Sequence, residues 1–354
     1  MNKSALFGLK YSNRDFSKKE CWGKNQFNSS FPTSLAIYLQ SKKLNNVYIK
    51  LNSKMNTHLE FIETNELLGI DCLSDDVFFS FESVYSPFQQ LLIGDTPRVD
   101  LVVQKRSDST IIKGLEIKLT ALPDNTTCDQ LESNFGCEIV IRPDTIVYLA
   151  CSIAQNYKND LSKLKSLFPK KIGEIEDWSE AENILPHIAL MLKTINKICL
   201  DNIDSQEPLV MQPIWKTKGK KAQLADNCLD VFVWSNLAFI SLFTNGINSN
   251  QETTRITRQI RTLVWLTKML FDFSLSGQID HRSIIDELSF NTKNDKAFAA
   301  SGTITHPFMK GEILTTPRIK KEEIKNIILN GGQNMLSPER RFDAIICNTP
   351  NLFK

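Results

Sequence analysis

The segment PRVDLVVQK (97–105) and the two segments that follow it, RSDS (106–109) and TIIKGLEIKLT (110–120), decide the fold. The first and third segments carry the runs of β-branched and aliphatic residues that are typical of buried strands. The polar segment between them has the composition of a turn. We therefore predict a β-hairpin, with one strand on either side of residues 106–109.

Two acids and a lysine interrupt the apolar strands of this hairpin. Asp100 lies on the first strand, and fifteen residues separate it from Glu116 on the second. Lys118 follows Glu116 by two residues, so both side chains point to one face while Ile117 points into the core. Buried charges are costly unless they are paired or used. Because Mg²⁺ prefers carboxylate oxygens and assists phosphodiester hydrolysis, the pattern predicts a metal-dependent nuclease site.

The same residues allow a plainer interpretation. Glu-x-Lys is common on strands, and a solvated edge hairpin would make Glu116 and Lys118 ordinary surface residues. Three details favour the nuclease site: a proline precedes the strand of the first acid, both strands have apolar runs, and a helix-like segment with Glu82 lies upstream. Asp75 and Asp76 compete with Glu82 as a further acid.

The rest of the chain is typical of one large α/β protein. Its 354 residues are 42% hydrophobic and 23% charged, and the net charge of +2 neither demands nor excludes nucleic acid. We expect a single elaborated domain over 1–354, with a nuclease core at roughly 60–200 and a helical, DNA-contacting elaboration at roughly 201–354. The periodicity predicts helices at 31–41, partly at 77–92, at 155–168, 178–200, 251–275 and near 320–329, and strands within 138–154, at 209–216, at 229–234 and near 342–347.

Cysteine and histidine usage favours a reduced protein without zinc. The eight cysteines are scattered without a C-x-x-C pair, and the four histidines lie far apart. The first residues lack the apolar stretch of a signal peptide, and no apolar run is long enough for a membrane span. We expect buried free thiols and a cytoplasmic location.

Several polar segments are candidates for DNA contacts, and each has an ordinary alternative. Arginines recur every three residues in 251–275, where they would follow phosphates or simply form a solvated helix face. The basic loop 216–221 would attract DNA or serve as a solubilising turn. An N-terminal polar loop and a pair of arginines near the C-terminus could read base edges, or be a plain loop and ion-pair partners. The candidates are Lys24, Asn25, Gln26, Lys220, Lys221, Arg255, Arg258, Arg261, Arg340 and Arg341.

The arrangement resembles the PD-(D/E)XK nuclease core, which has a mixed central sheet flanked by helices, here with a largely helical C-terminal elaboration. Several segments also resemble the HindVP family of type II restriction endonucleases, and their common order is more specific than any one of them. The segments are FGLKYSNRDFSKKECWGKNQFNSSFP (7–32), TPRVDLVV (96–103), GLEIKLTALPD (114–124), IRPDTIVYLA (141–150) and LSPERRFDAI (336–345).

The resemblance implies specific roles for the hairpin residues. Asp100, Glu116 and the backbone carbonyl of Ile117 would be Mg²⁺ ligands, with Glu82 as a further candidate. Lys118 would orient or activate the attacking water and stabilise charge at the phosphate. In this chain the acid follows Pro-Arg-Val instead of following Pro directly, which lowers the specificity of the motif.

The resemblance also implies partners and a product. It implies a homodimer that cuts double-stranded DNA at a short palindrome, with GRCGYC as the associated target, and leaves 5′-phosphates. A cognate DNA methyltransferase would be its functional partner in a restriction-modification system. Two other hypotheses remain: a structure-specific or repair PD-(D/E)XK nuclease, and a non-catalytic DNA-binding protein with a degenerate nuclease core.

Overall fold

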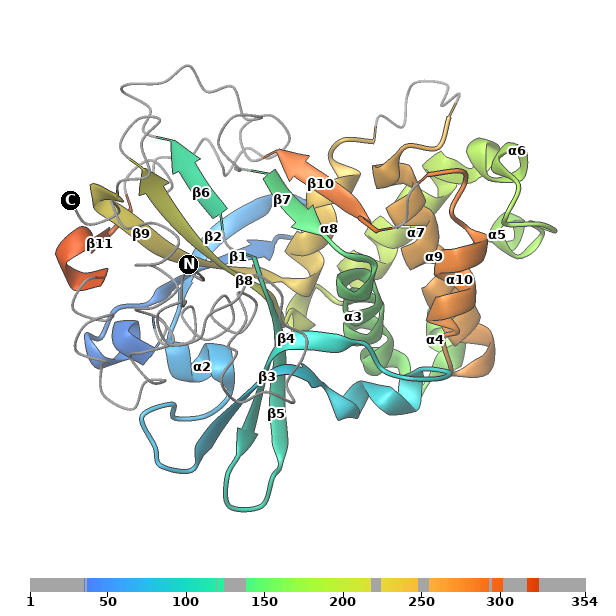
Figure 1. Ribbon diagram of the computed structural model, residues 1–354. Helices are drawn as coiled ribbons and strands as arrows, with labels where there is room; N and C mark the ends of the chain where they lie inside the picture. Colours follow the sequence, from blue (N-terminus) through green and yellow to red (C-terminus); the bar gives the residue numbers. More distant parts are fainter. Residues whose placement is uncertain are drawn as a thin grey trace, which may run out of the picture.

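A computed structural model gives the arrangement of most of the chain (Figure 1). The residues that it describes are residue 35 and residues 37–118, 120–123, 138–217, 224–247, 255–292, 295–301 and 317–324. The expected strand near 342–347 lies outside these residues, as does most of the loop 216–221.

The strands of the described residues fall into two sheets. In chain order they are β1 (Asn46–Leu51), β2 (Thr57–Ile62), β3 (Val77–Val84), β4 (Arg98–Lys105), β5 (Ile111–Ile117), β6 (Thr120–Pro123), β7 (Glu138–Ile141), β8 (Pro208–Thr217), β9 (Leu224–Ser235), β10 (Phe298–Ser301) and β11 (Ile319–Lys320). The large sheet has the order β2-β1-β9-β8-β5-β4-β3, with β11 paired to β9 and β6 paired to β8. The small sheet pairs β7 with β10.

The large sheet is mixed. The β1–β9 and β5–β8 pairs are parallel, whereas β3–β4 and β4–β5 are antiparallel. The predicted hairpin is therefore confirmed as β4–β5, with a turn at residues 106–108. Its register pairs Leu101 with Leu115. This register brings the first acid strand alongside the end of β5, where Glu116 lies.

Helices cover both faces of this sheet. The α-helices are α2 (Thr64–Leu68), α3 (Pro143–Ala154), α4 (Leu161–Leu167), α5 (Lys170–Gly173), α6 (Ala181–Ile184), α7 (Ile188–Asp201), α8 (Asn236–Thr244), α9 (Arg258–Ser276) and α10 (His281–Glu287). Short 3₁₀ helices are η2 (Ser86–Leu91), η4 (Gln155–Tyr157), η5 (Leu185–His187) and η6 (Ile203–Ser205). Figure 1 shows α3, α4, α7, α8, α9 and α10 gathered on one side of the sheet and α2 on the other.

The two sheet faces have separate hydrophobic cores. Val102 and Val210 belong to the larger core, together with buried residues of α3, α7, α8 and α9. Leu101, Leu115 and Ile117 belong to the second core, together with residues of α2. This alternation confirms that Ile117 points into a core. The side chains of Asp100 and Glu116 are therefore directed to the other face, on which α3 lies.

Two expected elements differ from the observed ones. Residues 77–92 form strand β3 and the 3₁₀ helix η2, because the aromatic and β-branched side chains of 77–84 fit a pleated surface and pair along β4. Within 138–154, the expected strand is limited to β7. The apolar run that follows is helix α3, which starts at Pro143, because proline at the first helical position has a suitable φ and lacks only an N–H that would be unpaired.

The helices expected elsewhere are observed with different bounds, and the one expected at 178–200 is divided into α6, η5 and α7, which ends at Asp201. α9 starts after Thr257, whose side chain accepts a hydrogen bond from the Ile260 N–H, and ends at Gly277 in the left-handed conformation. Residues 37–41 and 321–324 are helical within the expected N- and C-terminal helices.

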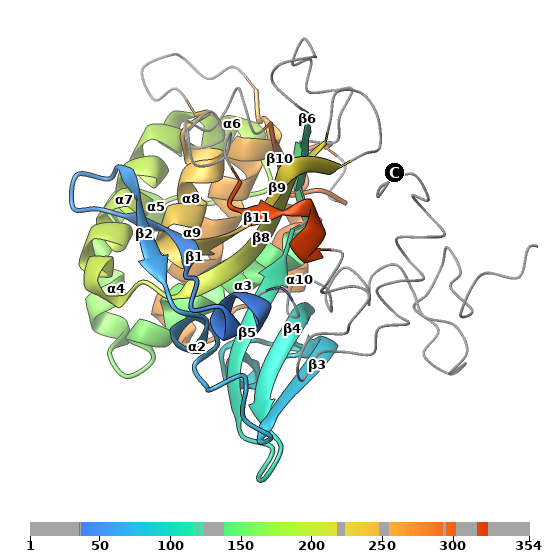
Figure 2. The same cartoon turned by 90° about the vertical axis from the view of Figure 1, so that its left-hand side faces the viewer.

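The large sheet combines segments that are far apart in the chain. β8 and β9, both beyond residue 200, lie between β1 and β5. β3, β4 and β5 extend together from the same end of the molecule (Figure 2). The protein is thus a mixed α/β structure with a central sheet flanked by helices.

Among the described helices, none has the length and apolar character needed to cross a membrane.

Candidate active site

The hairpin brings the predicted acids and lysine together. The Lys118 Nζ atom lies 3.0 Å from Glu116 Oε2 and 3.6 Å from Asp100 Oδ2. Asp100 Oδ2 also accepts a hydrogen bond from the Ile117 N–H at 2.7 Å. The Lys118 N–H donates to the Met211 carbonyl at 3.0 Å, so the residue that follows β5 is still attached to β8. Neighbouring strands on both sides thus position the three side chains.

The site is nearly closed to solvent. The exposed fractions of the side chains are 23% for Asp100, 6% for Glu116 and 15% for Lys118. The plainer interpretation, in which Glu116 and Lys118 are solvated surface residues, does not fit these fractions. Glu116 receives a second hydrogen bond on its other oxygen, because Thr145 Oγ1 of α3 donates to Glu116 Oε1 at 3.1 Å.

Burial and mutual interaction shift the three pKa values. Burial, followed by the nearby negative charge of Glu116, raises the pKa of Asp100 to about 9. Burial alone would raise the pKa of Glu116, but the charge of Lys118 and hydrogen bonds from Asp100, Lys118 and Thr145 outweigh it and lower this pKa. Burial opposes the charge on Lys118, but the two carboxyl groups raise its pKa. The raised pKa of Asp100 and the lowered pKa of Glu116 have one cause: two buried carboxyl groups share one nearby cation, and Lys118 lies closer to Glu116.

These residues fit a hard divalent cation. Two carboxyl groups face one another across the hairpin, and Mg²⁺ is often held by one or two carboxylates, with water and substrate phosphate completing its shell. Within the described residues, no three His, Cys, Asp or Glu side chains converge as a metal cluster. A divalent cation held here would therefore have the two carboxyl groups of Asp100 and Glu116 as side-chain ligands, with water and substrate left to complete its shell.

The third candidate acid, Glu82, lies on the neighbouring strand. β3 and β4 pair Phe81 with Leu101 and Ser83 with Val99, so Glu82 lies opposite Asp100 in the register. Its φ of 52° is left-handed, which is rare for a residue with a side chain inside a strand. It does not join Asp100 and Glu116 in a three-acid cluster. The upstream segment that carries it is a strand, where we expected a helix.

The arginine stripe expected on the long helix is not continuous. Arg261 is fully buried; it donates to the Thr292 and Lys296 carbonyls at 3.0 and 2.6 Å, and its guanidinium lies 4.4 Å from the Trp265 ring centre. Arg258 is half-buried at the first turn of α9, and Arg255 is exposed just before it. Arg261 therefore binds Thr292 and Lys296 in the interior and is not available to DNA.

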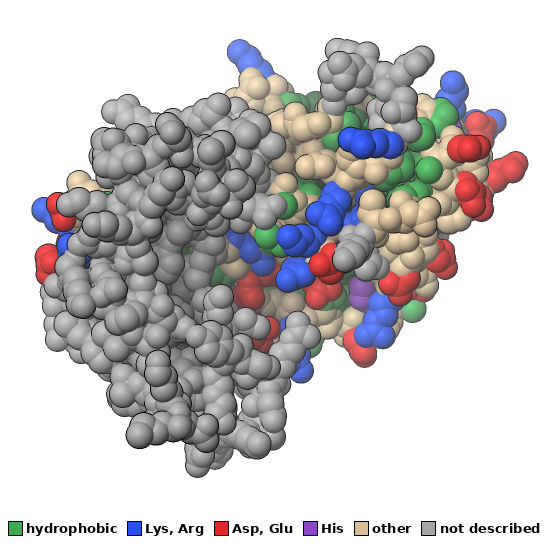
Figure 3. Space-filling model, turned by 45° about the horizontal axis from the view of Figure 1, so that its top comes forward, with side chains coloured by type: hydrophobic (Ala, Val, Ile, Leu, Met, Phe, Trp, Pro, Cys, Tyr) green, Lys and Arg blue, Asp and Glu red, His purple; other side chains and the backbone are tan. Residues whose placement is uncertain are grey.

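The other candidates for DNA contact lie outside the described residues. They are Lys24, Asn25, Gln26, Lys220, Lys221, Arg340 and Arg341. Figure 3 shows one face of the molecule, on which basic side chains gather beside acidic ones. The described surface in this view therefore has mixed charge.

Two residues of α3 are part of the site although the sequence did not single them out. Thr145 contacts Glu116, and three residues later the Tyr148 hydroxyl donates to the Pro97 carbonyl at 3.0 Å. The Tyr148 oxygen also accepts the Tyr85 N–H at 3.0 Å. The available sequence signal was the Pro-Asp pair at 143–144, which marks the start of a helix directly after a strand.

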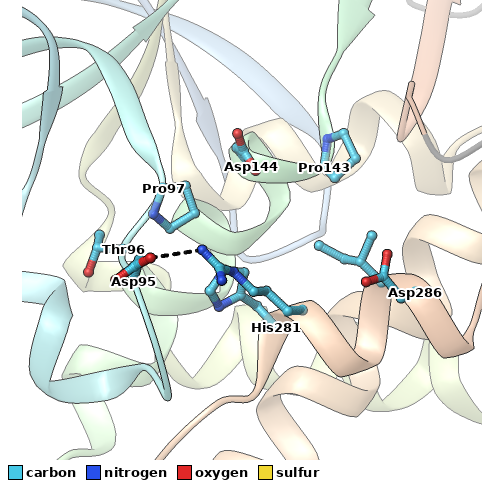
Figure 4. Close-up of a pocket in the computed structure, with 9 residues that line it drawn as sticks. Asp95, Thr96, Pro97, Pro143, Asp144, His281 and Asp286 are labelled. Atoms are coloured by element: carbon cyan, nitrogen blue, oxygen red, sulfur yellow. Dashed lines mark hydrogen bonds and ion pairs between the residues drawn. The ribbon is translucent and has the colours of Figure 1, made fainter.

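A pocket of about 380 Å³ lies beside these elements (Figure 4). It lies between the segment that leads into β4, the start of α3 and helix α10. Its lining consists of Asp95, Thr96, Pro97, Pro143, Asp144, His281, Arg282, Ile285 and Asp286. Arg282 forms an ion pair with Asp95 at 3.0 Å. Three carboxyl groups accompany one guanidinium, so the lining does not favour a DNA phosphate.

Comparison with known proteins gives the family to which the chain belongs. The chain is 47% identical to the type II restriction enzyme HgiDI of Herpetosiphon aurantiacus over 354 residues, which cover 100% of this chain and 98% of the relative. It is 46% identical to the probable type II restriction enzyme HindVP of Haemophilus influenzae over 352 residues, which cover 99% and 96% of the two chains. The first relative is thus a type II restriction enzyme, and the second is a probable one.

A family model covers nearly the whole chain. Residues 22–353 match the HindVP restriction endonuclease family. The chain belongs to this family of type II restriction endonucleases, and the resemblance inferred from its segments is confirmed. No solved structure matches the chain.

Proposed function

We propose that the protein is a Mg²⁺-dependent, site-specific deoxyribonuclease that hydrolyses phosphodiester bonds of double-stranded DNA through a PD-(D/E)XK-type site. The observation that carries this proposal is the close approach of Lys118 to Asp100 and Glu116 across the hairpin. Membership of the restriction endonuclease family supports the reaction class. The burial of all three side chains favours use in chemistry over solvation at a surface.

Each residue of the site has a role in this proposal. Asp100, Glu116 and the backbone carbonyl of Ile117 would hold Mg²⁺, which when bound supplies positive charge at the scissile phosphate and acidifies a water molecule. Asp100 must ionise to serve as a ligand, because only the carboxylate binds the cation strongly. Lys118 keeps its ammonium group beside both carboxyls, where it can orient the attacking water and offset charge that develops on the phosphate.

The products, the oligomeric state and the target sequence are proposed from the family resemblance. We propose in-line attack by water that leaves a 5′-phosphate and a 3′-hydroxyl, and a homodimer that presents one site to each strand of a short palindrome. GRCGYC is the target that the resemblance implies. A cognate methyltransferase would protect the same sequence without being bound to the enzyme.

Cleavage and DNA binding, measured separately, test the site. Asp100→Ala and Glu116→Ala should each lower cleavage roughly a thousandfold, because loss of a metal ligand removes several kcal/mol of transition-state stabilisation. Binding of a DNA fragment in Ca²⁺, measured by gel shift, should stay within a few-fold of wild type. A matched control is Asp226→Asn, whose side chain is fully exposed. Normal cleavage by either alanine variant would refute the assignment.

A further inference from the structure

Thr145 is the third residue of α3, so no carbonyl of its own helix lies four residues before it, and its hydroxyl is available to another partner. Helical threonines commonly donate to the carbonyl four residues earlier. Thr194, Thr244, Thr262 and Thr267 all do so, at 2.7 to 3.0 Å. Thr145 instead donates across to Glu116 Oε1 at 3.1 Å. The carbonyl four residues before it, that of Ile141, accepts the Ala297 N–H.

Thr145 and Lys118, which lie on different elements, bind different oxygens of Glu116. Oε1 is bound by Thr145, and Oε2 is bound by Lys118 at 3.0 Å. A carboxylate held at both oxygens by groups on different elements cannot rotate freely about its last bond. Thr145 is fully buried, so water cannot replace its hydroxyl without rearrangement.

The position of Thr145 does not depend on Glu116. Tyr148, one turn further along α3, ties the helix to the Pro97 carbonyl and the Tyr85 N–H. Residues three apart lie on the same side of a helix, so this anchor and Thr145 face the hairpin together. The Tyr148 ring also packs against Phe88 of η2, with 5.6 Å between ring centres. The hydroxyl of Thr145 is thus presented from a fixed helix.

We propose that Thr145 is a positioning residue, which holds Glu116 in the orientation needed to bind the divalent cation. The proposal rests on the proposed function of the hairpin site. Groups that hydrogen-bond metal-binding carboxylates orient these ligands, and their loss typically weakens metal binding or activity about 10- to 100-fold. In this role Thr145 acts through Glu116 and is not itself a ligand of the cation.

Two variants of Thr145 and one matched control test this role. Thr145→Val keeps the shape and removes the hydroxyl, whereas Thr145→Ser keeps the hydroxyl. Thr194→Val is the control, because Thr194 is equally buried in a helix but donates to the Leu190 carbonyl. The readouts are Mg²⁺ binding by calorimetry without DNA, the Mg²⁺ concentration for half-maximal cleavage, and the melting temperature.

We expect Thr145→Val to need at least about tenfold more Mg²⁺ in both measurements. Thr145→Ser should stay within about threefold of wild type, and Thr194→Val should match wild type in Mg²⁺ response whatever its melting temperature. If Thr145→Val does not fold, Thr145→Ala takes its place with the same expected shift. A Mg²⁺ response of the hydroxyl-free variant equal to that of Thr194→Val would overturn the positioning role. Failure of wild type itself to bind Mg²⁺ and cleave would instead overturn the proposed function, and this inference with it.

Discussion

The raised pKa of Asp100 gives a sharp prediction about stability without metal. Its pKa lies near 9 in the folded protein, because of burial and of the neighbouring Glu116, against about 4 in an unfolded chain. Between these values the folded state binds one more proton than the unfolded state. The free energy of unfolding must therefore fall as pH rises, and this contribution is largest below the unfolded pKa and is lost as pH rises toward the folded pKa.

The magnitude follows from one proton. A difference of one bound proton gives a slope of about 1.4 kcal/mol per pH unit. Asp100→Asn has no such proton and places a neutral donor beside Glu116, as protonated Asp100 does. Relative to this variant, wild type should lose about 3 kcal/mol of unfolding free energy between pH 5.5 and pH 7.5.

Urea unfolding in EDTA at several pH values measures this difference. Subtracting the Asp100→Asn curve from that of wild type removes the titration of all other groups to a first approximation. In a second series, Mg²⁺ should raise the unfolding free energy of wild type by binding to the folded state and leave that of Asp100→Asn unchanged. If the difference in unfolding free energy between wild type and Asp100→Asn does not vary with pH, Asp100 is ionised in the folded protein. This result would refute the reasoning about the paired carboxyl groups.

Three further variants separate roles at other positions. Lys118→Met should lower the unfolding free energy by about 3 kcal/mol at pH 8, because it leaves the buried Glu116 without its cation. The loss should be smaller at pH 5, and equal losses at both pH values would contradict this prediction. Arg261→Ala should lower the unfolding free energy by about 3 kcal/mol, because it removes hydrogen bonds and the contact with the Trp265 ring. Arg258→Ala should change it by less than about 0.5 kcal/mol. Similar losses for both variants in thermal melts would contradict the assignment of Arg261 to the core. Glu82→Gly removes the carboxyl group of a residue with a left-handed φ and should leave the Mg²⁺ dependence of cleavage unchanged. A large shift in that dependence would make Glu82 a metal ligand.

The hairpin and its three functional candidates could be predicted because their signals are local. Residues 97–120 hold two apolar strands and a turn within one short segment, and alternation along a strand decides which side chains share a face. The sequence alone therefore predicts that Glu116 and Lys118 lie on the sheet face opposite to that of Ile117. The same pattern could not reveal that α3 would cover this face.

Other features needed contacts between distant residues. The aromatic run at 77–84 fits a helix or a strand equally by composition, and only its pairing with β4 makes it β3. Arg261 repeats with Arg255 and Arg258, but its partners at 292 and 296 are more than thirty residues away. Thr145 reaches Glu116 across 29 positions, and no periodicity in either segment encodes that contact.

The most direct test of the central claim is digestion of a plasmid of known sequence with purified wild-type protein and with Asp100→Asn, each in Mg²⁺ and in EDTA. Discrete fragments with 5′-phosphate ends, produced only by wild type and only in Mg²⁺, are the predicted result, and mapping the ends gives the target sequence. Fragments without defined ends would favour a structure-specific nuclease. DNA that is bound but not cut in any of several divalent metals, or normal cutting by Asp100→Asn, would contradict the account of the hairpin site.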